Sequence, residues 1–210
     1  IHFAPAIELS FGFTLNGLGG LLAINRRIAT DELRKGIRDG TAATLLFPEN
    51  PIDAAKTILE KVRTVFPKEE GAFVVGPLAE LGWGSQAGFV IAKLGLMIGL
   101  PDPKVVLLGA LQVGVPSAKV DEKLRIVDLR AEIYGEFTPE YVLLRVGLSN
   151  SKLGQMAISG DLGLLIRWAG GADFALSVGG FFPGFPAPPE LAGMRRIRMD
   201  LSPAKWLEIY

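Results

Sequence analysis

The chain has 210 residues, of which 22 are Lys or Arg and 22 are Asp or Glu, so its formal net charge at pH 7 is zero. It contains no Cys and one His, His2, which excludes a disulfide framework, a thiolate metal site and an ordinary Ser-His-Asp triad. Because binding to phosphate needs a basic surplus, the charge balance predicts no nucleic-acid partner. Hydrophobic residues make up 49% of the chain, enough for a single β-rich module over residues 1–210.

The first predicted elements are two strands near the N-terminus. Residues 7–15 alternate loosely between apolar and polar, and residues 18–28 form a second extended segment. The dipeptide Asn16-Gly17 between them is typical of a hairpin turn.

A two-helix insertion is predicted over about residues 30–67. Thr30 is a suitable N-cap for a first helix over 31–38, and Pro51 is a suitable first residue for a second helix that ends before Pro67. The apolar residues of the second helix are spaced 3 or 4 apart and therefore share one face. We expect that face to pack on a sheet.

The most apolar stretches are residues 89–100 and 105–115, joined by a turn at Pro101-Asp-Pro103. Lys93 and the prolines interrupt them, so the sequence predicts no transmembrane helix. They are interpreted as a hairpin whose strands are apolar on both faces, which indicates cover on both sides by helices, a partner or a ligand.

The remaining sequence predicts an antiparallel meander. Short turns separate alternating segments, and the alternation slips near Asp128, which indicates a bulge. The fold class is therefore α+β and mainly antiparallel: a meander or curved sheet with the helical insertion packed on it. The predicted strands are residues 123–137, 141–148, 156–168, 174–181 and 196–201.

One glycine motif invites a cofactor interpretation. Gly82, Gly84 and Gly88 follow an apolar segment, as glycines do where a dinucleotide pyrophosphate approaches a helix N-terminus. No helical pattern follows Gly88, so a turn between strands is the favoured interpretation, and no cofactor, catalytic residue or metal ligand is assigned. A nucleotide-dependent enzyme remains the third functional alternative.

Candidate contact residues come from two places. The segment 179–189 holds three Phe among Pro and Gly, and its Phe181, Phe182 and Phe185 either close the end of the core or form an exposed patch. Phe89 and Ile91, in the first of the two doubly apolar strands, complete the predicted interaction residues.

Four segments resemble a conserved family of domains of unknown function found in very large bacterial proteins, some of them labelled phage-tail-like. They are residues 12–22, 46–51, 75–84 and 159–183, although Phe182 stands where members often have His. The resemblance implies no catalytic residues. Together with a start at Ile1 and an apolar end at Tyr210, it predicts a fragment of a longer polypeptide.

The sequence thus favours a non-catalytic structural or scaffold segment of a large multidomain bacterial protein. Its apolar sheet would contact other segments of the same protein or partner proteins. The alternative is a groove for lipid or another apolar ligand, lined by residues 89–115. Absence of Cys suits either the bacterial cytoplasm or a secreted particle, so the compartment stays open.

Overall fold

We analysed a computed structural model of the chain, which describes residues 1–38, 60, 62–84, 88–201 and 208–209. Eleven strands, one α-helix and three short 3-10 turns make up this part. The strands are β1 His2–Glu8, β2 Phe13–Arg26, β3 Lys68–Trp83, β4 Val90–Leu100, β5 Lys104–Val115, β6 Val127–Phe137, β7 Tyr141–Leu153, β8 Met156–Arg167, β9 Asp173–Val178, β10 Arg198–Leu201 and β11 Glu208–Ile209; the helix α1 is Thr30–Arg38, and the 3-10 turns are η1 Ser10–Gly12, η2 Glu122–Leu124 and η3 Pro189–Leu191.

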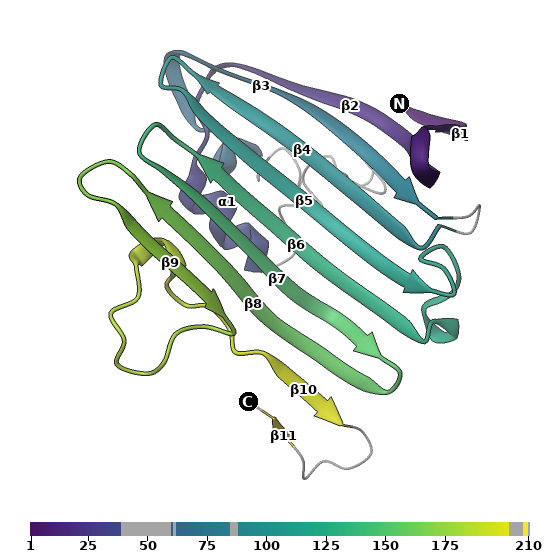
Figure 1. Cartoon of the computed structure of the whole chain (residues 1–210). Coiled ribbons are helices and arrows are strands. Elements are labelled where there is room, and N and C mark those ends of the chain that lie inside the picture. The colour runs from purple at the N-terminus through teal and green to yellow at the C-terminus, as the bar shows by residue number, and fades with distance from the viewer. Residues whose placement is uncertain (39–59, 61, 85–87, 202–207, 210) are drawn as a thin grey trace.

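All strands belong to one antiparallel sheet, and from β1 to β8 each strand pairs with the next along the chain (Figure 1). This confirms the α+β class and the meander. The end of the meander is different from a simple up-and-down order, because β9 and β10 both pair with β8, at its two ends. The long hairpin through residues 101–103 is also confirmed. The bulge predicted near Asp128 is not in β6: this strand pairs with β5 without a shift across Asp128, and the extra residue lies in β7, between Leu148 and Ser151.

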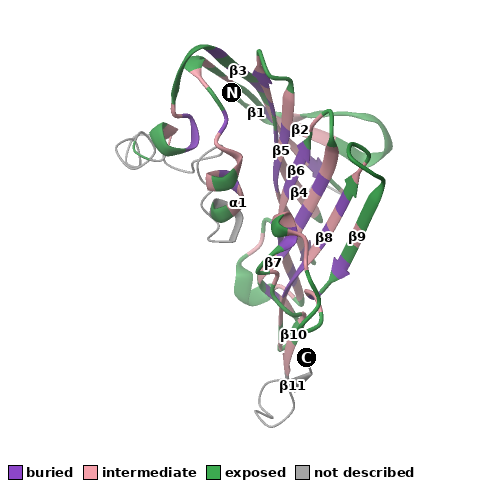
Figure 2. Cartoon of the chain, turned by 90° about the vertical axis from the view of Figure 1, so that its left-hand side faces the viewer, coloured by how far each residue is buried: buried purple, intermediate pink, exposed green. Residues whose placement is uncertain are grey.

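One face of the sheet, here called the helix-side face, carries α1 (Figure 2). The predicted helix over 31–38 is present, but it begins one residue earlier, at Thr30. The carbonyl oxygen of Ala29 accepts the hydrogen bond from Leu33 N, so Thr30 is not the residue before the helix; Leu33 is fully buried against the sheet. The second predicted helix lies mostly outside the described residues, but residues 62–65 are helical and end before Pro67. Val65 and Phe66 join Leu33 in the core because each presents an apolar side chain to the sheet.

The core is a layer between these helical segments and the middle of the sheet. It is built from β-strand residues that share one side of the pleat, together with the cover that packs on them. The buried members are Ile28, Leu33, Val65, Phe66, Val74, Met97, Val106, Leu108, Tyr134, Leu143, Leu165 and Leu191.

A buried carboxylate fastens α1 to the sheet. Glu136 on β6 is fully buried and accepts hydrogen bonds from Arg34 of α1, from Tyr134 Oη at 2.8 Å and from Tyr141 Oη at 2.8 Å. Lys104 Nζ lies 3.5 Å away. Burial alone would raise the pKa of Glu136, but the bonds from Arg34 and the tyrosines lower it below its ordinary value.

Two further expectations from the sequence are corrected. Asn16-Gly17 is not a hairpin turn: it lies inside β2, where the register shifts between Leu15 and Gly17, and the turn is formed by Phe11 and Gly12, both at positive φ. The strands β4 and β5 are not doubly apolar along their whole length either. On their helix-side positions Lys93 and Gln112 alternate with Ile91 and Ala110 beyond the helical segments.

Replacement of the buried carboxylate tests its role in fastening the helix. We expect Glu136→Gln to lower the free energy of unfolding by about 3 kcal/mol at pH 7, because Arg34 loses its charged partner inside the protein. Since the folded-state pKa is depressed, wild-type Glu136 stabilises the fold above its ordinary pKa and loses this effect as the pH falls through the folded value. The difference in free energy of unfolding between the wild type and Glu136→Gln, measured with urea, should therefore be smaller below about pH 4 than at pH 7.

The control is Glu69→Gln, which removes a half-exposed ion pair with Arg27 at 3.0 Å. Such a surface pair contributes below about 1 kcal/mol. Equal losses for the two variants would contradict the assigned role of Glu136.

Candidate functional site: an apolar sheet face

The face of the sheet opposite α1, here called the apolar face, carries no charged side chain from β4 to β9, and its polar register position on β7 is Ser151, whose hydroxyl bonds the backbone of Arg130 and Ser149. The pairing registers align its members across the strands, since every second residue points to the same side. They are Phe13, Leu15, Leu18, Gly20, Leu22 and Ile24 on β2; Phe73, Val75, Pro77, Ala79, Leu81 and Trp83 on β3; Val90, Ala92, Leu94, Leu96, Ile98 and Leu100 on β4; Val105, Leu107, Gly109, Leu111, Val113 and Val115 on β5; Val127, Leu129, Ala131, Ile133, Gly135 and Phe137 on β6; Val142, Leu144, Val146 and Leu148 on β7; Leu162, Leu164 and Ile166 on β8; and Phe174, Leu176 and Val178 on β9.

The charged side chains of β4 to β9 all lie on the helix-side face. The pairing registers put each of them on the same side of the sheet as core residues such as Val106 and Leu143. They are Lys93, Lys104, Asp128, Arg130, Glu132, Glu136, Arg145, Lys152, Asp161, Arg167 and Asp173. The apolar face of these strands therefore carries no charged side chain.

The apolar face is far larger than an ordinary surface patch. Ten residue steps along β6 give about 33 Å, and the strands from β2 to β9 span about 34 Å at the usual spacing, so the face covers roughly 1,100 Å2. The largest apolar patch of a typical monomer is about 300–600 Å2. At the margins of the face the side chains are most open, with Leu22 67% and Phe174 63% exposed.

The aromatic residues of the apolar face stand only near the ends of the strands. Phe13 and Trp83 are paired at one end, with ring centroids 6.4 Å apart. Phe73, Phe137 and Phe174 lie toward the opposite end, where the hairpins β4–β5, β6–β7 and β8–β9 turn. Between the two ends the face carries only aliphatic side chains, Pro and Gly.

The two described tryptophans direct their polar atoms away from the middle of the face. Trp83 Nε1 donates to the carbonyl oxygen of Phe11 at 3.2 Å, and Trp168 Nε1, just beyond β8, donates to the carbonyl oxygen of Pro139. Each indole thus has its hydrogen bond on a turn and its apolar body beside the sheet. Such rings suit a boundary between water and hydrocarbon.

The predicted contact residues of the Phe-Pro segment lie with the helix-side face. Phe181 packs against the core, and Phe185 stacks on it with ring centroids 5.3 Å apart. Phe182 is 79% exposed. The segment therefore both closes one end of the core and presents one free phenyl ring, and it is separate from the apolar face.

The other predicted residues also lie off the apolar face. Phe89 precedes β4 and contacts the position of Gly84, while Ile91 points to the helix-side face and lines a pocket there. Gly82 lies in β3, and Gly84 and Gly88, both at positive φ, flank the connection from β3 to β4. Because a strand follows, the motif lacks the helix N-terminus that a dinucleotide site uses.

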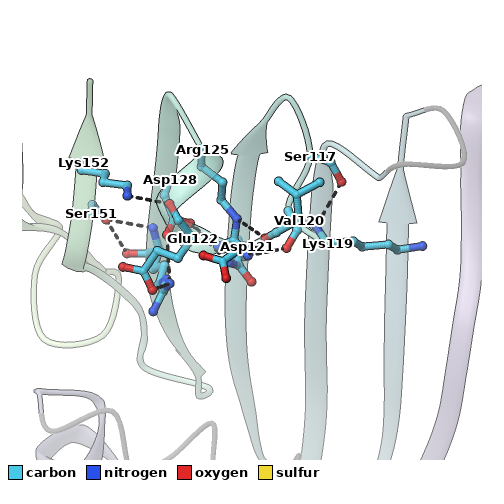
Figure 3. A network of polar contacts seen from close by, with 12 residues as sticks. Ser117, Lys119, Val120, Asp121, Glu122, Arg125, Asp128, Ser151 and Lys152 are labelled. Atoms are coloured by element: carbon cyan, nitrogen blue, oxygen red, sulfur yellow. Dashed lines mark hydrogen bonds and ion pairs between the residues drawn. The ribbon is translucent and has the colours of Figure 1, made fainter. Parts of the chain in front are cut away.

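The helix-side face carries a polar network beyond the helix (Figure 3). Asp128 is fully buried and accepts hydrogen bonds from Arg130 at 2.9 Å, Gln112 at 3.2 Å and Arg125 at 3.0 Å. Burial alone would raise the pKa of Asp128, but these bonds lower it. In the part of the chain that the structure describes, no three acidic, His or Cys side chains gather as a metal site.

The fold and its two unlike faces define a class: an open antiparallel sheet with a charged, helix-covered side and an apolar side. The chain matches the model of a family of unknown function, DUF6603, over residues 1–210, and it belongs to that family. No curated protein and no solved structure gives a match. None of the described helices has the length and hydrophobicity needed to cross a membrane.

Dye binding tests whether the apolar face is accessible. We expect the chain to enhance the fluorescence of anilinonaphthalene sulfonate, and the variant Leu22→Lys/Leu176→Lys to lose most of that enhancement. Both leucines lie on the apolar face, and they are 67% and 54% exposed. Lysines there introduce charge without removing packed core atoms.

The matched control is Leu124→Lys/Ile126→Lys, whose residues are 68% and 65% exposed and lie between β5 and β6, off the apolar face. This variant should keep the dye enhancement. Equal loss in both variants would contradict the accessibility of the apolar face.

Proposed function

We propose that this chain is a non-catalytic lipid-binding module that holds lipid molecules with their acyl chains against the apolar face. The observation that carries the proposal is the continuous apolar surface that this face forms over seven successive strand pairings, free of charged side chains from β4 to β9. A surface of this size releases on the order of 25 kcal/mol when it is removed from water. The face therefore has a strong driving force for cover by hydrocarbon.

The scarcity of hydrogen-bonding side chains supports lipid as the cover. Protein interfaces carry about one hydrogen bond per 100–200 Å2, so a protein partner over about 1,100 Å2 would ordinarily find several polar groups. On the apolar face of β2 to β9, the hydroxyl of Ser151 is already bonded to the backbone of Arg130, and the aliphatic side chains offer no polar group. Acyl chains need no such partner.

The placement of aromatic residues supports the same occupant. A stripe of about 33 Å along the strands exceeds the length of one lipid leaflet, about 20 Å, so a lipid can lie along it with its headgroup beyond one end. Trp83 and Phe137 stand at such ends. The indole of Trp83, with a polar N–H and an apolar body, favours the boundary between acyl chain and headgroup.

The scaffold role predicted from the sequence is the competing proposal for the same face. In that role, the sheet would be covered by another apolar protein layer, which would come from the same very large bacterial protein or from a partner. Face-to-face packing of sheets also excludes water without hydrogen bonds. It does not by itself account for aromatic residues confined to the ends of the strands.

Lipid extraction tests the proposed function. We expect the chain purified from a bacterial host without detergent to carry lipid in near-stoichiometric amounts, detected by native mass spectrometry and by analysis of the organic extract. The variant Leu22→Lys/Leu176→Lys should carry at least about tenfold less, because each lysine places a charge against acyl chains.

Leu124→Lys/Ile126→Lys should retain the wild-type amount of lipid. A lipid-free chain that forms concentration-dependent oligomers through the apolar face would refute lipid binding and support the protein-contact role. Loss of lipid in both variants would also refute it, because the lipid would then not depend on the face.

Fluorescence quenching tests the position of the lipid. In a Trp206→Phe background, Trp83 and Trp168 are the emitting residues. We expect lipids brominated near the carbonyl group to quench them more than lipids brominated near the methyl end, since both indoles lie at the ends of the strands. Equal quenching by the two lipids would contradict this arrangement.

A further inference from the structure

A pocket of about 530 Å3 opens on the helix-side face, beyond the strand positions that α1 covers. It is therefore on the opposite side of the sheet from the apolar face. Its floor includes Ile91 and Ala110, while polar side chains of β4 to β7 form its walls. The polar residues are Lys93, Gln112, Arg130, Glu132, Ser149 and Asn150. A cavity of this size and mixed lining suits a small organic molecule.

The buried network of Figure 3 holds two of these walls in place. Asp128, labelled in Figure 3, accepts a hydrogen bond from the amide of Gln112 at 3.2 Å and another from the guanidinium of Arg130 at 2.9 Å. Arg130 also donates to Glu122 at 2.8 Å. Anchored at its tip by two carboxylates, the Arg130 side chain has a fixed orientation before any ligand arrives.

Two cationic side chains of the pocket keep donors unused. Within the described residues, the half-buried Lys93 has no hydrogen bond and no ion pair, and the buried Nε of Arg130 has no acceptor. Buried donors in proteins are nearly always paired. Oxygen atoms of an anionic ligand would satisfy both.

The two donors are placed so that one ligand can reach both. Lys93 pairs with Ala110 on β5, and Arg130 pairs with Gln112 on the same strand, so their Cα atoms lie about 12 Å apart across two strand spacings. Each side chain extends several ångströms from its Cα, which leaves the width of a small organic group between their tips.

We propose that this pocket binds a small organic monocarboxylate, whose oxygens accept hydrogen bonds from Lys93 Nζ and Arg130 Nε. A single negative charge fits better than the two of a phosphate, because Glu132 also lines the pocket and Asp128 and Glu122 already balance the charge of Arg130. The apolar floor accommodates the carbon skeleton. Asn150 and Ser149 supply further polar contacts at the rim.

Benzoate is the probe for this site, with neutral benzamide as the matched compound without charge. In titrations followed by two-dimensional amide NMR, we expect saturable shifts around Lys93, Gln112 and Asn150 with benzoate. Benzamide should bind about tenfold more weakly, since it offers no charge-assisted hydrogen bond.

The variant Lys93→Met should weaken benzoate binding by about tenfold, whereas Lys123→Met, which changes an exposed loop lysine, should leave it unchanged. Arg130→Lys keeps the positive charge and removes the Nε donor, and it should also weaken binding while the amide spectrum stays folded. Absence of saturable shifts at millimolar benzoate, equal binding of benzamide, or full affinity in Lys93→Met would overturn the proposal.

Because the pocket and the apolar face lie on opposite sides of the sheet, the variants at Leu22 and Leu176 should not alter benzoate binding. Failure of lipid binding and failure of carboxylate binding are thus separate outcomes.

Discussion

The strand register is the constraint on which the two faces of this molecule depend. Side chains alternate with a period of two, so a shift by one residue in any strand would move its charged residues onto the apolar face. A slip of β6 would place Asp128, Arg130 and Glu136 among leucines. The bulges keep charged residues off the apolar face, as between Leu15 and Gly17 on β2, although the bulge in β7 brings Ser151 to that side. Hydrogen-bonded pairing along long strands therefore fixes both surfaces at once.

The helix-side face divides into two parts that use buried charge differently. Under α1, Glu136 ties helix to sheet through Arg34 and the two tyrosine hydroxyls, so the carboxylate serves packing. Toward the other end of the same strand, Asp128 orients Arg130 and Gln112 around a pocket. Both carboxylates have a depressed pKa because donated hydrogen bonds outweigh the cost of burial. The first arrangement stabilises the fold, and the second pre-organises a candidate binding site.

Much of the fold could be predicted because its signals are local. The alternation in residues 156–168 and the helical pattern of residues 31–38 depend only on neighbours in sequence, and both elements formed, although the helix begins at Thr30 itself and not after it. The prediction of a hairpin turn at Asn16-Gly17 was wrong because a turn signal of two residues competes with the pairing of a whole strand. By continuing through these residues, β2 forms more backbone hydrogen bonds with β3 than a turn would allow. The attachment of β10 to β8 was also beyond local pattern, since it joins strands separated by the Phe-Pro segment.

The candidate site was only partly visible in the sequence. The apolar excess was assigned to residues 89–115, yet it belongs to one face of every strand from β2 to β9, including strands such as β6 that read as half polar. A search for apolar residues at every second position in all strands together would have found it. The sequence by itself determined that the strands are amphipathic, that no thiol or histidine chemistry is available, and where the first helix lies. Only the tertiary structure decided which residues of different strands stand side by side, because backbone pairing alone merges separate apolar stripes into a continuous surface and brings Lys93 and Arg130 to one pocket.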